Sequence, residues 1–236
     1  MRKIYIYQSL FLGIFNFAQN YTPNGYQSSY SSTLSVNSLG GDHAVFGVKS
    51  ENSGKSLKYD EIIGSPYLDK GFRDATVAKD YEKTAVRYNS YLDEIEFQKD
   101  GKPLVLPKEV KFYRIELYSP KETIVFLETN DNLKGYFFEI VNHNNISLYK
   151  KIRTKFIDAI PAANSYASDK AASFKLLDPV YYLKTEKGFI KNPRNKKEII
   201  DQFPEKKDSL EVFFKENKIK FDKEEDLKKL VTFLNQ

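Results

Sequence analysis

The sequence contains no cysteine, no tryptophan and a single methionine. Without cysteine the chain forms no disulfide, offers no thiolate to a metal ion or a nucleophilic step, and carries no site for a lipid on an N-terminal cysteine. Stability must therefore come from the burial of apolar side chains. The chain is long enough to form one sizeable core with an appendage.

The sequence also lacks the short motifs that mark common catalytic and metal sites. Neither histidine, His43 or His143, stands in an H-x-x-H or H-E-x-x-H arrangement, and no G-x-S-x-G elbow presents a serine. Residues 53–56 (Ser-Gly-Lys-Ser) are similar to the end of a phosphate-binding loop, but Lys49 occupies the position of its first glycine. We therefore predict no catalytic residue, no metal site and no cofactor.

The charge distribution gives no sign of a polyanionic partner. Lys and Arg number 37 and Asp and Glu number 32, so the formal net charge is +5. The two signs are interspersed along the chain, whereas a nucleic-acid footprint needs clustered basic residues. The composition is typical of a lysine-rich soluble surface, and we expect no nucleic-acid partner.

The first residues have the layout of a secretory signal peptide. Met1-Arg2-Lys3 is positively charged, residues 4–17 are mostly apolar, and Ala18 is followed by Gln19. The apolar run is shorter than the about 20 residues that span a bilayer. The sequence thus predicts a signal peptide over residues 1–18, removed after Ala18, and no transmembrane segment in the mature chain. The alternative is a buried N-terminal strand or helix of a cytosolic protein.

Residues 19–56 are polar and poor in aliphatic side chains, so this segment cannot bury enough apolar area to offset the entropy lost on ordering. We predict a flexible N-terminal arm. Its interleaved tyrosines, Tyr21, Tyr26 and Tyr30, suit the alternative of a segment that becomes ordered against a partner.

Residues 57–192 alternate short strands with turn formers at a spacing of about ten residues, without helical periodicity. The 17 Tyr and 18 Phe residues suit sheet faces. This pattern predicts an antiparallel meander, in a mainly β (α+β) protein, that forms a curved sheet or an open barrel. The predicted strands are 75–78, 84–88, 91–98, 103–106, 111–117, 123–128, 135–141, 146–153, 180–185 and 189–191, with 123–127 and 136–141 buried on both faces.

Two further segments complete the predicted organisation. Residues 160–172 are small and polar and indicate a surface loop, with a lid over a cavity as the alternative. Residues 193–236 form a predicted helical appendage packed on the sheet, with helices over 196–203 and 205–216. A last helix starts at a capping box formed by Asp222 and Glu225. Its apolar stripe is Leu227, Leu230, Val231 and Leu234.

The best candidates for a binding site lie in the middle of the chain. Glu94 and Glu96 are two apart on a predicted strand, so their carboxylates point the same way, as a glycosidase pair would. The simpler interpretation is that Glu94 and Glu96 lie on a solvent-exposed face of the sheet. Arg87, next to Tyr88, suits the binding of a carboxylate or stacking on a ring, and a surface ion pair is again the simpler interpretation.

Several stretches resemble a group of exported proteins of flavobacteria and related Bacteroidota for which no activity is known. They are residues 12–19, 64–68, Arg87-Tyr88-Asn89 with 93–97, and 226–230. The resemblance covers most of the chain from about Asp60 and implies a Gram-negative envelope setting, without functional residues. The C-terminus does not resemble the Ig-like sorting domain of such bacteria, which favours the periplasm or the periplasmic side of the outer membrane. Residues 208–210 (Asp-Ser-Leu) are similar to their short O-glycosylation site.

Two functions compete on these grounds. The first is a non-enzymatic cell-envelope protein that binds a partner protein or belongs to an outer-membrane assembly. The second is a periplasmic carrier or hydrolase of lipid or glycan with a sheet-lined cavity. A deep cavity holding a polar pair such as Glu94 and Arg87 would favour the second, and a filled core the first.

Overall fold

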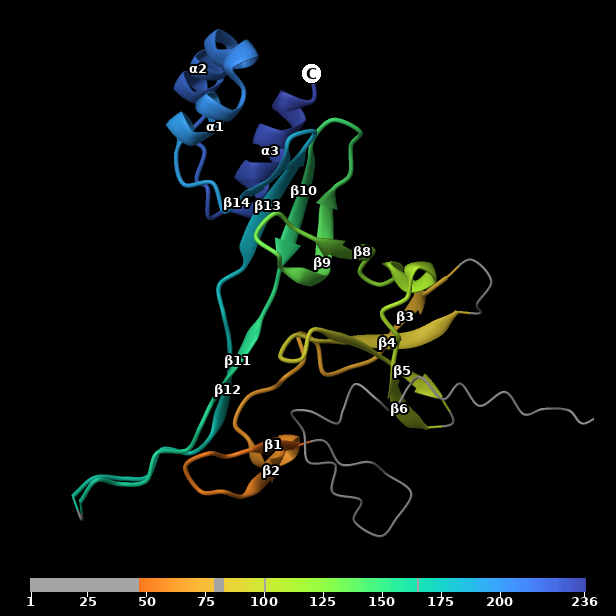
Figure 1. The fold of residues 1–236 in the computed structure, drawn as a ribbon, viewed down its shortest axis with the longest axis vertical. Helices are drawn as coiled ribbons and strands as arrows, with labels where there is room; N and C mark the ends of the chain where they lie inside the picture. The colour runs from red at the N-terminus through yellow and green to blue at the C-terminus, as the bar shows by residue number, and fades with distance from the viewer. Residues whose placement is uncertain (1–46, 79–82, 100, 165) are drawn as a thin grey trace, which may run out of the picture.

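The computed structural model describes residues 47–78, 83–99, 101–164 and 166–236 (Figure 1). Within them a ten-stranded antiparallel sheet runs through the molecule, two short two-stranded ribbons lie beside one end of it, and helices cover the other end. The prediction of a mainly β fold with a C-terminal helical part is confirmed. The sheet curves but does not close into a barrel.

The strands of the large sheet follow one another in the order β14-β13-β10-β9-β8-β7-β3-β4-β5-β6, so β14 and β6 are its two edges. Their bounds are β3 Arg73–Thr76, β4 Thr84–Asn89, β5 Glu94–Lys99, β6 Lys102–Val105, β7 Arg114–Leu117, β8 Glu122–Glu128, β9 Lys134–Val141, β10 Ser147–Lys151, β13 Val180–Thr185 and β14 Gly188–Lys191. Most neighbours along the chain pair as hairpins, as expected for a meander.

The central strands β8 and β9 are buried on both faces, as predicted. Ile124 and Phe138 belong to a large core on one face, together with Tyr88 and Ile95 from the β4–β5 hairpin. Phe137 lies in a second cluster on the opposite face, with Val125, Tyr149 and Tyr182. Side chains of the sheet itself therefore cover both faces of these central strands.

Two predicted strands start later than expected. The strand predicted from Tyr91 begins at Glu94, because residues 90–93 form a turn in which Asp93 has a φ of 57°. The strand predicted from Lys111 begins at Arg114, since a short 3₁₀ helix, Val110–Phe112, comes first. In both cases side-chain alternation continues through the turn and conceals the start of the strand.

The first ribbon pairs β1 (Gly47–Lys49) with β2 (Ser56–Lys58), and the second pairs β11 (Thr154–Ile157) with β12 (Ser173–Leu176). They share a small core that includes Val48, Ile62 and Phe174. Residues 47–56, which belong to the segment predicted as a flexible arm, are thus part of the folded structure. The β11–β12 ribbon projects away from the sheet (Figure 1). Residues 160–164 and 166–171 are exposed, as residues of the predicted surface loop would be, and the alternative of a lid stays a prediction.

The helices are α1 (Lys196–Gln202), α2 (Lys207–Glu216) and α3 (Glu224–Leu234). The predicted stripe of α3 is buried with Leu148 and Leu183 of the sheet, which confirms the packing of the appendage. The predicted capping box does not form. Helix α3 begins at Glu224 without a side-chain cap, and its three acidic residues in the first turn favour the start through the helix dipole instead. Pro204 opens a 3₁₀ turn, so α2 starts at Lys207.

Candidate functional site

The β4–β5 hairpin brings three of the predicted site residues to one face of the sheet. In the register of the hairpin Arg87 lies opposite Glu96, and Asn89 lies opposite Glu94. Tyr88 projects from the other face into the large core. Glu94 and Glu96 therefore share a face, as predicted, and Arg87 lies on the same face. Tyr88 is separated from them because adjacent strand residues face opposite sides.

Arg87 and Glu96 form a satisfied buried ion pair. Arg87 Nε and Nη2 donate to Glu96 Oε2 over 2.8 and 2.7 Å, and Glu96 is 0% exposed. The guanidinium also donates to the Tyr67 hydroxyl and stacks on the rings of Tyr67 and Phe72. Asn89 Nδ2 donates to the second carboxylate oxygen of Glu96. These contacts hold the segment before β3 against the hairpin, and the simpler interpretation of an exposed pair is wrong.

Glu94 is the one carboxylate of this group with an unsatisfied oxygen. It is 7% exposed, and its Oε2 has no hydrogen-bond partner within the described residues. Burial raises the pKa of Glu94 from its ordinary 4.5 to about 7, while the nearby Lys108 ammonium opposes the shift. Such a group exchanges a proton near neutral pH.

A small hollow lies beside this hairpin. A hollow of about 20 Å³ lies beside Arg87 and Tyr88, and Glu94 is not part of its lining. That volume suits about one water molecule. Arg87 lines this hollow and Glu94 does not. The contacts of Arg87 with Glu96 and Tyr67 make it a structural clamp between the hairpin and the segment before β3.

A second buried polar group, which the sequence did not reveal, lies at the start of β5. Lys151 is 2% exposed and its Nζ donates to Asp93 Oδ1 over 2.6 Å and to the Tyr136 carbonyl over 2.8 Å. The Tyr88 hydroxyl donates to the same carboxylate oxygen over 2.7 Å. Burial lowers the pKa of Lys151, and the Asp93 carboxylate opposes this shift. In the sequence, Lys150-Lys151 looks like an ordinary solvated pair.

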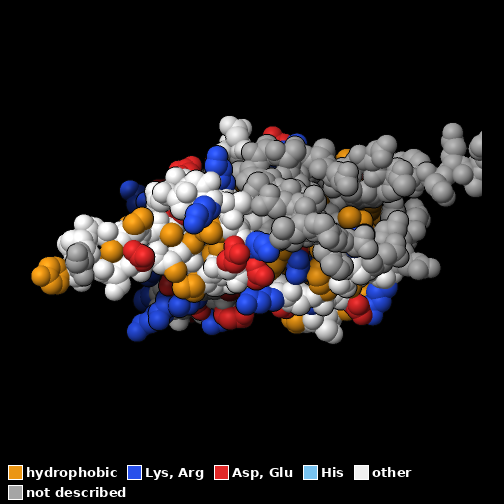
Figure 2. Space-filling model, turned by 90° about the horizontal axis from the view of Figure 1, so that it is seen from below, with side chains coloured by type: hydrophobic (Ala, Val, Ile, Leu, Met, Phe, Trp, Pro, Cys, Tyr) orange, Lys and Arg blue, Asp and Glu red, His pale blue; other side chains and the backbone are white. Residues whose placement is uncertain are grey.

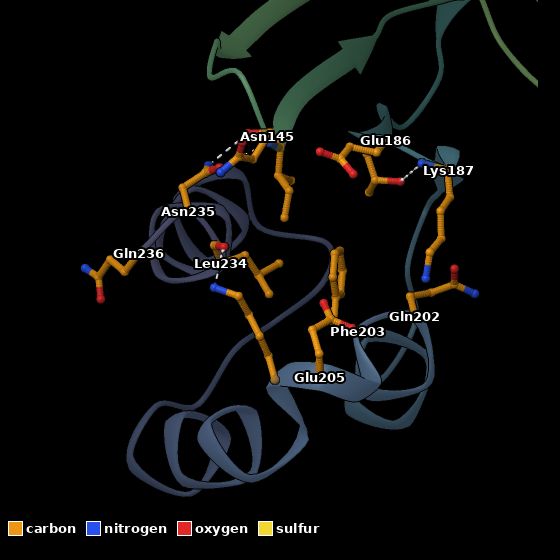
Figure 3. Close-up of a pocket in the computed structure, with 12 residues that line it drawn as sticks. Asn145, Glu186, Lys187, Gln202, Phe203, Glu205, Leu234, Asn235 and Gln236 are labelled. Carbon is orange, nitrogen blue, oxygen red and sulfur yellow. Dashed lines mark hydrogen bonds between the residues drawn. The ribbon is translucent and has the colours of Figure 1, made fainter.

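The larger hollow lies between the helices and the β13–β14 turn and has a volume of about 270 Å³ (Figure 3). We call it the helical hollow. Its apolar lining is Ile146, Phe203 and Leu234, and Figure 3 shows Phe203 and Leu234 projecting toward its centre. The other lining residues are polar and come from the turns and helix ends: Asn145, Thr185, Glu186, Lys187, Gln202, Glu205, Lys206, Asn235 and Gln236.

Hydrogen bonds fix the walls of the helical hollow. Asn235 exchanges two hydrogen bonds with the backbone of Ile146, of 2.9 and 3.1 Å, and so ties the end of α3 to the start of β10. Lys206 Nζ donates to the carbonyl of Leu234 over 3.0 Å, which caps the same helix end. A pocket with walls held in this way is formed before any ligand arrives.

The remaining predicted residues fall into two groups. Tyr21, Tyr26, Tyr30 and His43 lie outside the described residues. His143 lies in the β9–β10 turn, where it is exposed and its backbone N–H donates to Ser147 Oγ, as a solvated loop residue would.

The chain was compared with protein-family models, curated proteins and solved structures, and none of the three comparisons finds a match. Among the described residues no group of three or more His, Cys, Asp or Glu side chains is arranged to hold a metal ion. In the same part of the chain, no helix combines the length and the apolar character needed to cross a bilayer.

Proposed function

We propose that the protein is a non-enzymatic component of the cell envelope that binds a partner protein through the helical hollow. The observation that carries the proposal is the hollow itself, preformed and apolar at its centre. The setting, in the periplasm or at the periplasmic side of the outer membrane, rests on the signal-peptide layout of residues 1–18 and on the resemblance described above.

The size of the helical hollow favours a side chain over a free small molecule. About 270 Å³ is below the roughly 300–1,000 Å³ of pockets that enclose a drug-sized ligand. It suits one large apolar side chain, and anchors of this kind in preformed pockets carry much of the affinity of protein interfaces. Phe203 and Leu234 would contact the anchor and exclude water from it.

The charges around the helical hollow describe the partner further. Glu186 and Glu205 contribute carboxylates and Lys187 and Lys206 contribute ammonium groups, so neither sign dominates. A ligand of one charge would meet like charge on the rim. We infer a partner segment with one large apolar residue between polar residues of both signs.

The experiment is a mild-detergent purification of the tagged full chain from its own envelope. We expect one envelope protein to co-purify with the chain in a fixed stoichiometric ratio. In the variant Gln202→Trp, a bulky ring on the rim narrows the hollow and the partner is lost. The matched control is Val212→Trp, in which the replaced side chain lies on α2 and is 55% exposed. This variant should keep the partner. A protein that purifies alone, or a partner retained equally by both variants, would contradict the proposal.

A second candidate function, a carrier or hydrolase of lipid or glycan, rests on Glu94. Its raised pKa and unsatisfied oxygen are properties of general acids. This candidate predicts a lipid or glycan that purifies with the chain and is lost in Glu94→Gln. Native mass spectrometry of the purified chain tests this second function. A spectrum without bound lipid or glycan would contradict it.

A further inference from the structure

The β11–β12 ribbon is rigidly held at its base. Thr154 bonds to Ser90 through both its backbone N–H and its hydroxyl, over 2.9 and 2.7 Å. Ile63 exchanges backbone hydrogen bonds with Ala172 and Phe174 on the other strand. Phe174 packs edge-on against Tyr59. The base therefore cannot swing freely, and the direction in which the ribbon projects is fixed by the fold.

Beyond the base, the ribbon is held by bonds between its own two sides. Ile160 and Lys170 form an isolated antiparallel bridge, and Ala162 N donates to Asp169 Oδ1 over 2.7 Å. We call residues 160–164 and 166–168 the ribbon tip. Every one of these residues is exposed, with Ile160 at 50% and Tyr166 at 100%. Such exposure of large apolar side chains on a projection marks a contact surface.

The residues of the ribbon tip have no charged side chains of their own, and the Asp169 carboxylate contacts the tip backbone at Ala162. Residues 159–168 contain no Asp, Glu, Lys or Arg, in a chain of which 29% is charged. Figure 2 shows hydrophobic side chains gathered on the projecting end of the molecule, at the left of the view.

Asp158 and Asp169 bound the uncharged stretch in the sequence, and four basic residues lie beyond them. Lys155 and Lys175 face each other across the ribbon, Lys170 lies opposite Ile160, and Arg153 precedes β11. All four are exposed, and none has a carboxylate within ion-pair distance in the part of the chain that is described. The acidic residues of the ribbon are engaged locally, since Asp158 accepts from the backbone of Asn52 and Asp169 from that of Ala162.

We propose that the ribbon tip inserts into the interfacial layer of an anionic phospholipid membrane. Tyrosine and aliphatic side chains partition into that layer, and lysines behind them reach the phosphates while their stems lie along apolar surface. An uncharged tip behind which basic residues gather fits a lipid surface, where insertion of a charge is costly and anionic headgroups lie just above. This site is separate from the helical hollow and adds a lipid contact to the proposed protein contact.

The absence of tryptophan from the sequence supplies a direct test. In the full chain, Tyr166→Trp places the sole tryptophan on the ribbon tip. Val110→Trp places it on another exposed site, of 81% exposure, in the 3₁₀ helix before β7. Each variant is mixed with phosphatidylcholine vesicles that contain or lack phosphatidylglycerol, and tryptophan emission and its quenching by brominated lipid are recorded.

With anionic vesicles, the emission of Tyr166→Trp is expected to shift to the blue and to be quenched several-fold more than that of Val110→Trp. Because both reporters share the rest of the chain, general attraction of a basic protein to the vesicles does not separate them. In co-sedimentation, Tyr166→Asp should weaken binding about tenfold and Val110→Asp should leave it unchanged.

Emission of Tyr166→Trp that stays as in buffer would overturn the proposal, as would equal binding of Tyr166→Asp and the unchanged chain. An equal response to vesicles with and without phosphatidylglycerol would contradict the role of the lysines. The vesicles contain no protein, so a negative result here is distinct from a failure of the helical hollow to bind its partner.

Discussion

Asp93 and Lys151 lie 58 positions apart in the sequence, yet Lys151 Nζ is 2.6 Å from the Asp93 carboxylate. The pair connects the turn of the β4–β5 hairpin with the end of β10, and Lys151 reaches the Tyr136 carbonyl of β9 as well. Hairpins that are not sequential neighbours in the sheet are thereby fastened together. The contact therefore joins the two parts of the sheet that lie on either side of it.

The first prediction concerns this pair. Lys151→Met leaves the Asp93 carboxylate without its cation in a largely buried position, so we expect the free energy of unfolding to fall by about 3–5 kcal/mol. Lys150→Met, which breaks the more exposed pair with Glu224, should cost about 1 kcal/mol or less. Urea unfolding of both variants measures the difference. A smaller loss for Lys151→Met than for Lys150→Met would contradict the role assigned to the pair.

The second prediction concerns the Arg87–Glu96 pair. Arg87→Ala leaves a carboxylate with 1% exposure uncompensated, and we expect a loss of about 3–5 kcal/mol in the free energy of unfolding. The matched control is Lys83→Ala. Lys83 pairs with Asp74 at the surface, where both side chains are more than half exposed, so the expected loss in the free energy of unfolding is negligible. Similar denaturation midpoints for the two variants would refute a clamp at Arg87.

The third prediction concerns Glu94 and pH. Its pKa in the folded chain is about 7, against an ordinary 4.5, so the folded state binds the proton more tightly than the unfolded state. The free energy of unfolding should therefore fall as pH rises from about 4.5 to about 7. Above that range the contribution of Glu94 should no longer change with pH. We expect the titration of Glu94 to change the free energy of unfolding by about 2 kcal/mol, a figure that already allows for partial solvation of the carboxyl group.

Glu94→Gln removes this titration. Its stability should exceed that of the unchanged chain at pH 8 and should approach it at pH 4.5, because the amide resembles the protonated acid. Unfolding curves at a series of pH values provide the measurement. If the variant follows the same pH dependence as the unchanged chain, the assignment of the raised pKa to Glu94 fails.

The fourth prediction concerns Gly135 in β9. A Cβ at this position would overlap the carboxylate of Asp93 and crowd Lys151 Nζ, so Gly135→Ala must displace the pair. We expect a loss of about 2–4 kcal/mol, as for other disrupted buried networks. A Cβ at Gly71 meets nothing closer than Asp69 Oδ1 at 3.6 Å, and Gly71→Ala should change stability by about 0.5 kcal/mol or less. Thermal unfolding of both variants compares them.

The sequence predicted the architecture because alternation and turn chemistry are local. The turn formers between strands and the apolar stripe of α3 indicated the antiparallel sheet and the packed appendage, and both are present. Glu94 and Glu96 were placed on one face because the side-chain period of a strand is two. That part of the candidate site needed no knowledge of distant residues.

The remaining features depend on contacts between distant segments. Lys151 is buried because its partner Asp93 comes from another hairpin, and no local pattern distinguishes it from Lys150. The helical hollow combines residues from the β9–β10 turn, the β13–β14 turn and two helix ends. Residues 160–164 and 166–171 are exposed, in agreement with the predicted surface loop, but their position on a projecting ribbon follows from the register of β11 with β12.

The central claim, that the helical hollow receives a partner protein, is tested most directly by site-specific photo-crosslinking in living cells. A photoreactive amino acid replaces Gln202 on the rim of the hollow, and in a matched strain it replaces Val212 on the exposed side of α2. The account predicts one dominant protein adduct from position 202 that is absent from position 212. The absence of any adduct at position 202, or the same adducts at both positions, would contradict it.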